Sequence, residues 1–307
     1  MPWDDTQLCV ASLKEMTLIN QKVVKSKAES FFQPEWDDQG NLYVVSDRNN
    51  WWNLFRVDQS TNDMDLIPLT NIEAEIGLPQ WVFGQSRYVF VGDEIWLAYR
   101  EAGIDNLATL LPDGRLEKIE IDATEIESVT NYQDGIVATV SSWKAESLVT
   151  FVNRKEIRPL SKTRDLGIDE NWFPVPETFT YQTSDSEKAH ALFYSPTNPE
   201  YEISEKEKPP LIVLAHGGPT AAARRQLQLS ITYWTSRGFG VADVDYRGST
   251  GYGRSFRNRL RNSWGLADVE DCVSVAKYLV EQKKVDKNKL AIKGGSAGGF
   301  TVLAALT

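Results

Sequence analysis

A serine surrounded by glycines is the residue with the clearest chemical potential in this sequence. Residues 294–299 read Gly-Gly-Ser-Ala-Gly-Gly, which contains the spacing G-x-S-x-G around Ser296. Residues 290–293, Leu-Ala-Ile-Lys, predict a strand before this segment, and residues 297–306 predict a helix after it. A serine on such a tight strand-to-helix turn projects its hydroxyl above the sheet, where it can attack a carbonyl carbon. We therefore expect Ser296 to be a catalytic nucleophile, on a turn made by Gly294, Gly295 and Gly298.

The same turn offers hydrogen-bond donors for the negative charge that forms when a carbonyl is attacked. The helix expected after Ser296 points the unpaired N–H of Ala297 at this position. A second donor is expected from residues 216–219, His-Gly-Gly-Pro, which follow a continuous apolar run. Glycine lets the backbone approach the substrate closely, so Gly218 is the preferred donor and Gly217 the second choice. A glycine-rich turn can instead bind phosphate, but this segment lacks both the P-loop lysine and the spacing G-x-G-x-x-G.

Activation of a serine needs a base, and the sequence contains two histidines, His190 and His216. On a hydrolase fold with this type of turn the triad runs in the order Ser, Asp or Glu, then His, and both histidines precede Ser296. We expect His216 to brace its loop and His190 to be a structural strand residue. The eleven residues after Ser296 include neither Asp nor His. We therefore expect that the triad Asp and His lie beyond Thr307, that the chain is an internal fragment, and that it is inactive alone.

Composition excludes several other classes of function. Lys and Arg number 33 against 43 Asp and Glu, a formal net charge of -10, and no basic run is present, so nucleic acid is not an expected partner. Cys9 and Cys272 are too few for a disulfide framework or a zinc site, and we expect both to be buried thiols in a reducing, cytoplasmic setting. No run of about 18 apolar residues is present, so no membrane span is expected. No metal and no other cofactor are expected.

Residues 1–171 have the pattern of an all-β region. Short strands rich in Val, Tyr, Phe and Trp alternate with turns of Asp, Asn and Gly. Similar dipeptides at residues 53–54, 106–107 and 147–148 lie 53 and 41 positions apart, close to the roughly 40–50 residues of one propeller blade. We expect a partial β-propeller of about three blades and a fragment. A β-sandwich is the alternative, since short strands at regular spacing suit both folds.

Residues 172–307 change to alternating strands and helices. This order is typical of an α/β domain with a parallel sheet. The expected strands are residues 189–194, 211–215, 239–244 and 290–293, and the expected helices are a segment from residue 227, residues 267–281 and residues 297–306.

Four segments in this order resemble the peptidase domain of the prolyl oligopeptidase family, and the acylaminoacyl-peptidase and dipeptidyl-peptidase branches are the most similar. They are residues 216–219, residues 245–253 (Asp-Tyr-Arg-Gly-Ser-Thr-Gly-Tyr-Gly), residues 264–271 and the turn around Ser296. The resemblance implies an α/β-hydrolase domain with Ser296 as nucleophile, and an oxyanion hole made by the Ala297 N–H and residues 216–219. Residues 245–253 would shape the rim of the site. A tyrosine donor used by some members is replaced by His216, which favours a backbone donor.

The expected function is therefore a serine peptidase that cleaves short peptides through an acyl-enzyme, with access limited by the propeller. An esterase or acyl transferase on the same fold is one alternative, because the serine turn alone does not choose between amide and ester. A non-catalytic propeller scaffold is another. Short peptides are the expected partners, and a homo-oligomer is compatible with the sequence. If the chain ends within the domain, the helix after Ser296 should expose an apolar face of Phe300, Val302, Leu303 and Leu306.

Overall fold

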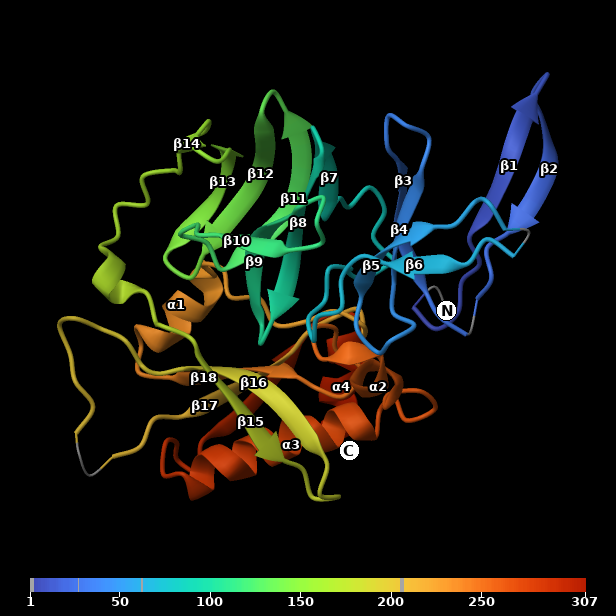
Figure 1. Ribbon diagram of the computed structural model, residues 1–307. Coiled ribbons are helices and arrows are strands. Elements are labelled where there is room, and N and C mark those ends of the chain that lie inside the picture. Colours follow the sequence, from blue (N-terminus) through green and yellow to red (C-terminus); the bar gives the residue numbers. More distant parts are fainter. Residues whose placement is uncertain (1–2, 27, 62, 205–206) are drawn as a thin grey trace.

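The computed structural model describes residues 3–26, 28–61, 63–204 and 207–307. Three four-stranded antiparallel sheets stand in a row on one side of the molecule, and a mixed sheet with its helices lies on the other (Figure 1). A two-stranded hairpin precedes the three sheets. The strands of this first part are β1 (Cys9–Lys14), β2 (Thr17–Val23), β3 (Phe31–Trp36), β4 (Leu42–Ser46), β5 (Asn53–Val57), β6 (Leu66–Pro68), β7 (Tyr88–Val91), β8 (Glu94–Glu101), β9 (Ile104–Leu110), β10 (Leu116–Ile119), β11 (Glu125–Tyr132), β12 (Gly135–Ser142), β13 (Ala145–Val152) and β14 (Ile157–Pro159).

Strand β8 shows why these sheets need apolar residues on both faces. Successive side chains of a strand point to opposite faces. Ile95 and Leu97 belong to a buried cluster with Leu54 of the first sheet. Trp96 belongs to another buried cluster with Ile136 of the third sheet. The middle sheet is therefore packed on both sides, and the strand-rich first part expected from the sequence is confirmed as a set of antiparallel sheets.

The mixed sheet of the second part has the strand order β15-β16-β18-β17-β19. Strands β18, β17 and β19 are parallel to one another, so their carboxyl ends meet at one edge of the sheet. The elements of this part are the 3₁₀ turn Glu170–Trp172, β15 (Glu177–Gln182), β16 (Lys188–Tyr194), β17 (Leu211–Ala215), α1 (Leu229–Thr235), β18 (Gly240–Asp245), α2 (Gly253–Asn258), α3 (Ala267–Glu281), β19 (Leu290–Gly294) and α4 (Ala297–Ala305).

The predicted parallel sheet is wrong for β16, and the fifth strand, β15, was not predicted. Strand β16 runs antiparallel to β18, and β15 pairs antiparallel with β16. Strands β15 and β16 are joined by a short turn as a hairpin. A turn this short can only join antiparallel strands, because parallel neighbours need a long crossover connection. The hairpin covers the edge of β18, and β19 forms the opposite edge of the sheet.

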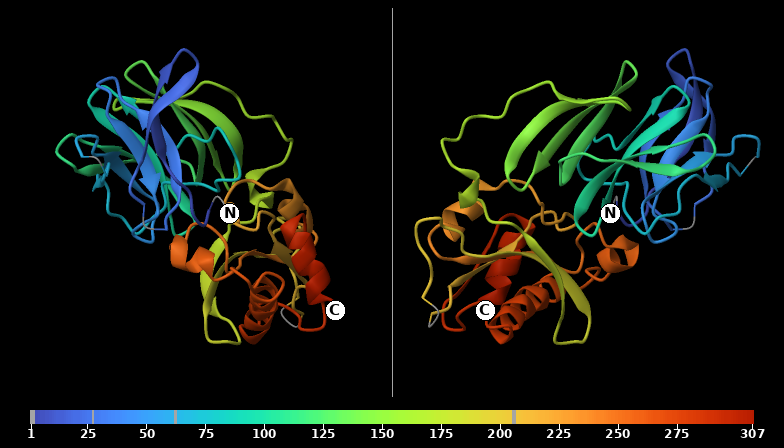
Figure 2. Two further views of the ribbon diagram at one scale, coloured as in Figure 1. Left: turned by 90° about the vertical axis from the view of Figure 1, so that its right-hand side faces the viewer. Right: turned by 60° about the vertical axis from the view of Figure 1, so that its left-hand side comes forward.

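Helices cover both faces of the mixed sheet (Figure 2). On one face α3 buries Val275 and Leu279 against Val213 of β17. On the other face Ile231 of α1 packs against Ile212, also of β17. A strand buried on both faces explains the continuous apolar run from which β17 was predicted.

The exposure of the two cysteines and of the apolar side chains around α4 can be compared with the sequence expectations. Cys272 is buried in α3, but Cys9 in β1 is exposed, so the expectation that both thiols are buried is wrong for Cys9. The side chains of Phe300 and Leu303 in α4, and of Leu306 directly after it, are exposed as expected, whereas Val302 is half-buried. Within the described ranges, no helix combines the length and the apolar character needed to cross a bilayer.

Candidate active site

Ser296 lies between the end of β19 and the start of α4, at the carboxyl edge of the parallel strands. Its backbone has φ 53° and ψ −121°. A non-glycine residue at positive φ is strained, at a cost of about 1–3 kcal/mol, and such residues cluster at functional sites. The strain is that of a sharp turn from strand to helix, which lifts the serine side chain out of the sheet.

Two positions of this turn must be glycine, because a side chain there would collide with backbone atoms. A Cβ atom on Gly294 would lie 2.4 Å from the carbonyl oxygen of Gly298, and a Cβ on Gly298 would lie 2.0 Å from the carbonyl oxygen of Ala215. Real Cβ atoms do not approach backbone oxygens so closely, so strand and helix cross here only because both residues are glycine. Around Gly295 no atom lies within 4 Å of such a Cβ, so this glycine is not needed for space.

Residues 216–221 follow β17 and lie beside Ser296, and we call them the oxyanion loop after the role expected from the sequence. A Cβ on Gly217 would lie 3.3 Å from the carbonyl oxygen of Gly295 and 3.4 Å from the Cβ of Ser296. Gly218 has φ +133°, and its nearest neighbours are Thr220 and Ala221 of its own loop. The structure therefore brings Gly217, the second choice from the sequence, directly against Ser296. The buried Ala297 begins α4 on the other side of Ser296.

His216 is fully engaged in holding the oxyanion loop. Its Nδ1 lies 2.8 Å from the carbonyl oxygen of Gly217, so Nδ1 carries a proton and donates it. Its Nε2 lies 2.7 Å from Ser249 Oγ, and its ring stacks on Tyr246 with centroids 4.3 Å apart. Burial lowers the pKa of His216 to about 4, so the ring is neutral near pH 7. These contacts are those of a bracing residue.

His190 lies far from Ser296. It belongs to β16, and two strands, β18 and β17, separate β16 from β19. Neighbouring strands are about 4.8 Å apart, so His190 and β19 are separated by about 14 Å in the sheet. Its Nδ1 lies 2.9 Å from Thr180 Oγ1, and its ring stacks on Tyr252 at 3.9 Å. Burial, with smaller contributions from Arg259 and Lys188, lowers the pKa of His190 to about 4.

Two buried aspartates lie in β18: Asp243, which the sequence reasoning missed, and Asp245, which it named only as the start of the segment expected to shape the rim. Asp245 accepts hydrogen bonds from Ala223 N at 2.7 Å and Tyr252 Oη at 2.7 Å, and burial raises its pKa to about 6. Burial and the charge of Asp245 raise the pKa of Asp243 to about 7. Because Asp243 and Asp245 are two residues apart, both lie on the same face of the strand. Two acidic residues on one face of an otherwise apolar strand were the signal in the sequence that could have identified them.

Asp243 lines a cavity of about 390 Å³ next to the serine turn, together with His216, Lys293, Gly294 and Gly295. A second cavity of about 410 Å³ lies between the two parts of the chain and is lined by Glu75, Arg100, Glu125, Trp81 and Arg224, among others. Among the residues that the structure describes, no group of three or more His, Cys, Asp or Glu side chains is placed to hold a metal ion.

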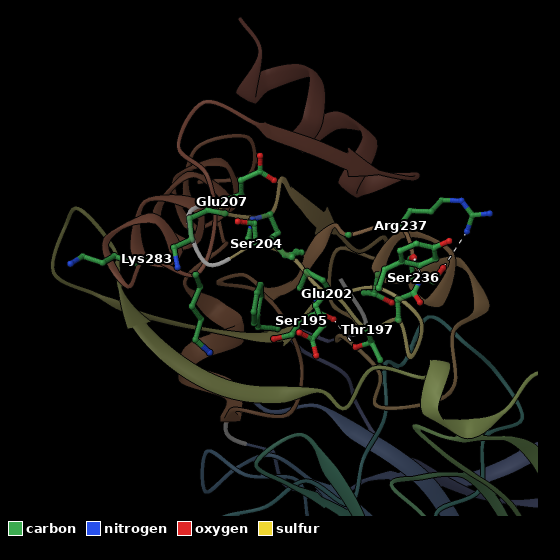
Figure 3. Close-up of a pocket in the computed structure, with 18 residues that line it drawn as sticks. Ser195, Thr197, Glu202, Ser204, Glu207, Ser236, Arg237 and Lys283 are labelled. Carbon is green, nitrogen blue, oxygen red and sulfur yellow. Dashed lines mark hydrogen bonds between the residues drawn. The ribbon is translucent and has the colours of Figure 1, made fainter.

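The largest of these cavities, about 830 Å³, is not lined by Ser296. It is lined by Ser195, Thr197, Arg237, Lys283 and others, beside Pro209 and Gly238 (Figure 3). These residues lie near the amino ends of β17 and β18. Ligands of α/β sheets bind at the carboxyl ends of the strands, so we assign the site to the edge that carries Ser296 and not to this cavity.

Comparison with known proteins gives the family that this chain resembles. Residues 225–307 match the profile of the prolyl oligopeptidase family, and this range includes Ser296. The structure of puromycin hydrolase is 35% identical and superposes on 100% of this chain with a TM-score of 0.94. The resemblance to the prolyl oligopeptidase family is therefore confirmed.

The curated relatives of this chain are named as peptidases or as enzymes that release acylamino acids. The rat (Rattus norvegicus) acylamino-acid-releasing enzyme is 30% identical over 160 residues, which is 50% of this chain and 20% of that protein. Dipeptidyl aminopeptidase BIII of Pseudoxanthomonas mexicana is 35% identical over 98 residues, 32% of this chain and 14% of that protein. The chain also covers only 47% of puromycin hydrolase, so it spans less than half of the proteins that it matches.

Proposed function

We propose that the chain carries the nucleophile of a serine peptidase that hydrolyses short peptides through an acyl-enzyme on Ser296. The observation that carries this proposal is the strained turn at Ser296, with the start of α4 on one side and Gly217 of the oxyanion loop on the other. The family match and the peptidase relatives support a hydrolase of peptide bonds.

In the proposed reaction the Oγ of Ser296 attacks the substrate carbonyl carbon while a base takes the hydroxyl proton. The carbonyl oxygen becomes an oxyanion, which the N–H of Ala297 and a backbone N–H of the oxyanion loop would stabilise. Collapse of this intermediate breaks the C–N bond, and the base returns the proton to the departing amine. Water then attacks the ester of Ser296 by the same steps, which releases the acid and restores the hydroxyl.

The base of this reaction is proposed to come from chain outside the 307 residues. Both ring nitrogens of His216 already have partners, and His190 lies three strand spacings from β19. A serine without a positioned base is a weak nucleophile. The 307-residue chain alone is therefore proposed to be inactive, and the triad histidine and carboxylate to follow Thr307 in the full-length protein.

The division of the chain is part of the same proposal. Residues 1–171 would be blades of a propeller, and residues 172–307 the first part of an α/β-hydrolase domain. Each sheet has the four antiparallel strands of a blade, and the middle sheet is packed on both faces. A propeller over the site would admit short peptides and exclude folded proteins.

A fluorophosphonate probe tests the proposal, because it reacts with an activated serine and reports on the site without assuming a substrate. The full-length protein should be labelled at Ser296 and should cleave chromogenic peptides but not a compact folded protein. Absence of labelling would favour a scaffold and refute the proposal. Labelling with hydrolysis of p-nitrophenyl esters but no peptides would refute the peptidase assignment in favour of an esterase.

A further inference from the structure

Glu75 is a buried carboxylate that the proposed chemistry does not use. It lies between β6 and β7, and its backbone forms an isolated bridge with Arg100 through two hydrogen bonds of 2.9 and 2.8 Å. Its side chain crosses to the second part of the chain, where Oε1 accepts a hydrogen bond from Gly253 N at 3.1 Å and Oε2 accepts one from Gly251 N. A buried carboxylate that accepts two backbone N–H groups fixes their position strongly.

The segment that Glu75 holds cannot take this shape with ordinary residues. Gly251 has φ +100° and Gly253 has φ +84°. A Cβ on Gly253 would lie 2.4 Å from Asn50 Nδ2, so the segment is pressed against the first antiparallel sheet. The positive φ angles turn two N–H groups toward one carboxylate, a concave arrangement that is suited to an anion.

The other side of the same segment braces the oxyanion loop. Thr250 N donates to the carbonyl oxygen of Ala221 at 2.8 Å, and Ser249 Oγ lies 2.7 Å from His216 Nε2. The hydroxyl of Tyr246 donates to the carbonyl oxygen of His216 at 2.9 Å. Residues 246–253 are therefore held by Glu75 on one side and support the loop that touches Ser296 on the other.

We propose that Glu75 is a positioning residue, which fixes the oxyanion loop through residues 246–253 although it belongs to the other part of the chain. This inference rests on the proposed function, because the oxyanion loop is assigned there. The oxyanion hole acts only if its donors are aligned when the negative charge develops. Loss of the clamp should therefore slow the chemical step more than it weakens substrate binding.

Asp47 provides a matched comparison at the same interface. It is also buried and pairs with two side chains of the second part, Arg254 at 2.8 Å and Arg257. Those partners lie on α2, and Asp47 has no contact with residues 246–253 among the hydrogen bonds of the described chain. If buried charge at the interface only holds the two parts together, Asp47 and Glu75 should be equivalent.

The test compares Glu75→Gln with Asp47→Asn in the full-length protein. The glutamine amide directs N–H toward one of the two backbone N–H groups, so the clamp is broken. A displacement of about 1 Å in a catalytic group costs about 100-fold, so we expect kcat for a chromogenic peptide to fall about 10- to 100-fold with little change in KM. Asp47→Asn should lower the melting temperature and leave kcat close to that of the unchanged protein. Glu75→Asp, which keeps the charge but shortens the reach, should give an intermediate kcat.

Amide hydrogen exchange gives a readout that needs no activity. Glu75→Gln should accelerate exchange in residues 216–221 and 249–253, whereas Asp47→Asn should not. If Glu75→Gln changes neither kcat nor exchange in these segments, or if Asp47→Asn changes both equally, the inference is overturned. If the unchanged protein hydrolyses no peptide, the proposed function fails, and the exchange experiment still decides whether Glu75 positions the loop.

Discussion

In the three antiparallel sheets large side chains fill the space between layers, whereas at the serine turn the space is filled by backbone. Trp96 is buried between the second and third sheets. At the turn the carbonyl oxygens of Ala215 and Gly298 occupy the places where Cβ atoms of Gly298 and Gly294 would lie. In the first region a change of side-chain volume should matter most. In the second, any side chain at Gly294 or Gly298 should matter.

The largest expected effect is at the serine turn. Removing the nucleophile from a serine triad typically lowers turnover about a millionfold, so Ser296→Ala in the full-length protein should abolish peptide hydrolysis. The hydroxyl is not part of the packing of the turn, so circular dichroism and melting temperature should stay unchanged. Chromogenic peptide hydrolysis checks the prediction, and retained activity above a few percent would contradict it.

The next largest effect tests whether the volume of a buried side chain between the sheets stabilises the fold. Trp96→Ala should lower the free energy of unfolding by about 3–5 kcal/mol, because it leaves a cavity between two layers. Trp36→Ala is the matched control, since Trp36 lies at the end of β3 and is half exposed. Urea unfolding measures both. Equal losses for the two variants would show that the layers are not packed as described.

A smaller effect tests whether the serine turn has room for a side chain at Gly298. Gly298→Ala should destabilise the protein by about 1–3 kcal/mol, because its Cβ forces α4 away from β17. The same substitution at Gly295 meets no atom within 4 Å and should leave stability unchanged. Thermal unfolding compares the two variants. Fluorophosphonate labelling of the full-length forms should be slowed in Gly298→Ala alone, and the comparison fails if Gly295→Ala is equally harmful.

The serine turn could be predicted because its requirements are local. The spacing of Gly294, Ser296 and Gly298 is set by one tight turn, and the sequence shows it directly. The preference between Gly217 and Gly218 could not be predicted, because it depends on where β17 and β19 meet. The antiparallel β15 and the carboxylate of Glu75 were missed for the same reason, since their partners lie far away along the chain.

The smallest expected effect contrasts two exposed aspartates, one in each region. In the second part, Asp185 bonds to Thr183 and to Arg247, 62 positions away, at 2.6 Å, and these hydrogen bonds lower its pKa to about 2. In the first part, Asp113 pairs at 2.7 Å with Arg115, two positions away, and this hydrogen bond lowers its pKa. A contact between near neighbours can persist in the unfolded chain, whereas the contact with Arg247 exists only in the folded one.

This difference predicts that only one of two substitutions has a pH-dependent effect on stability. The folded pKa of Asp185 lies below its unfolded value near 3.8, so its contribution is fully present above about pH 4 and is lost as the pH falls toward 2. Asp185→Asn should lower stability at pH 6 by less than about 1 kcal/mol, because the carboxylate is half exposed, and the difference should vanish near pH 2. Asp113→Asn should leave stability unchanged at both pH values. Urea unfolding at the two pH values measures this, and a loss for Asp185→Asn that persists in acid would show that packing, and not the charge contact with Arg247, stabilises this turn.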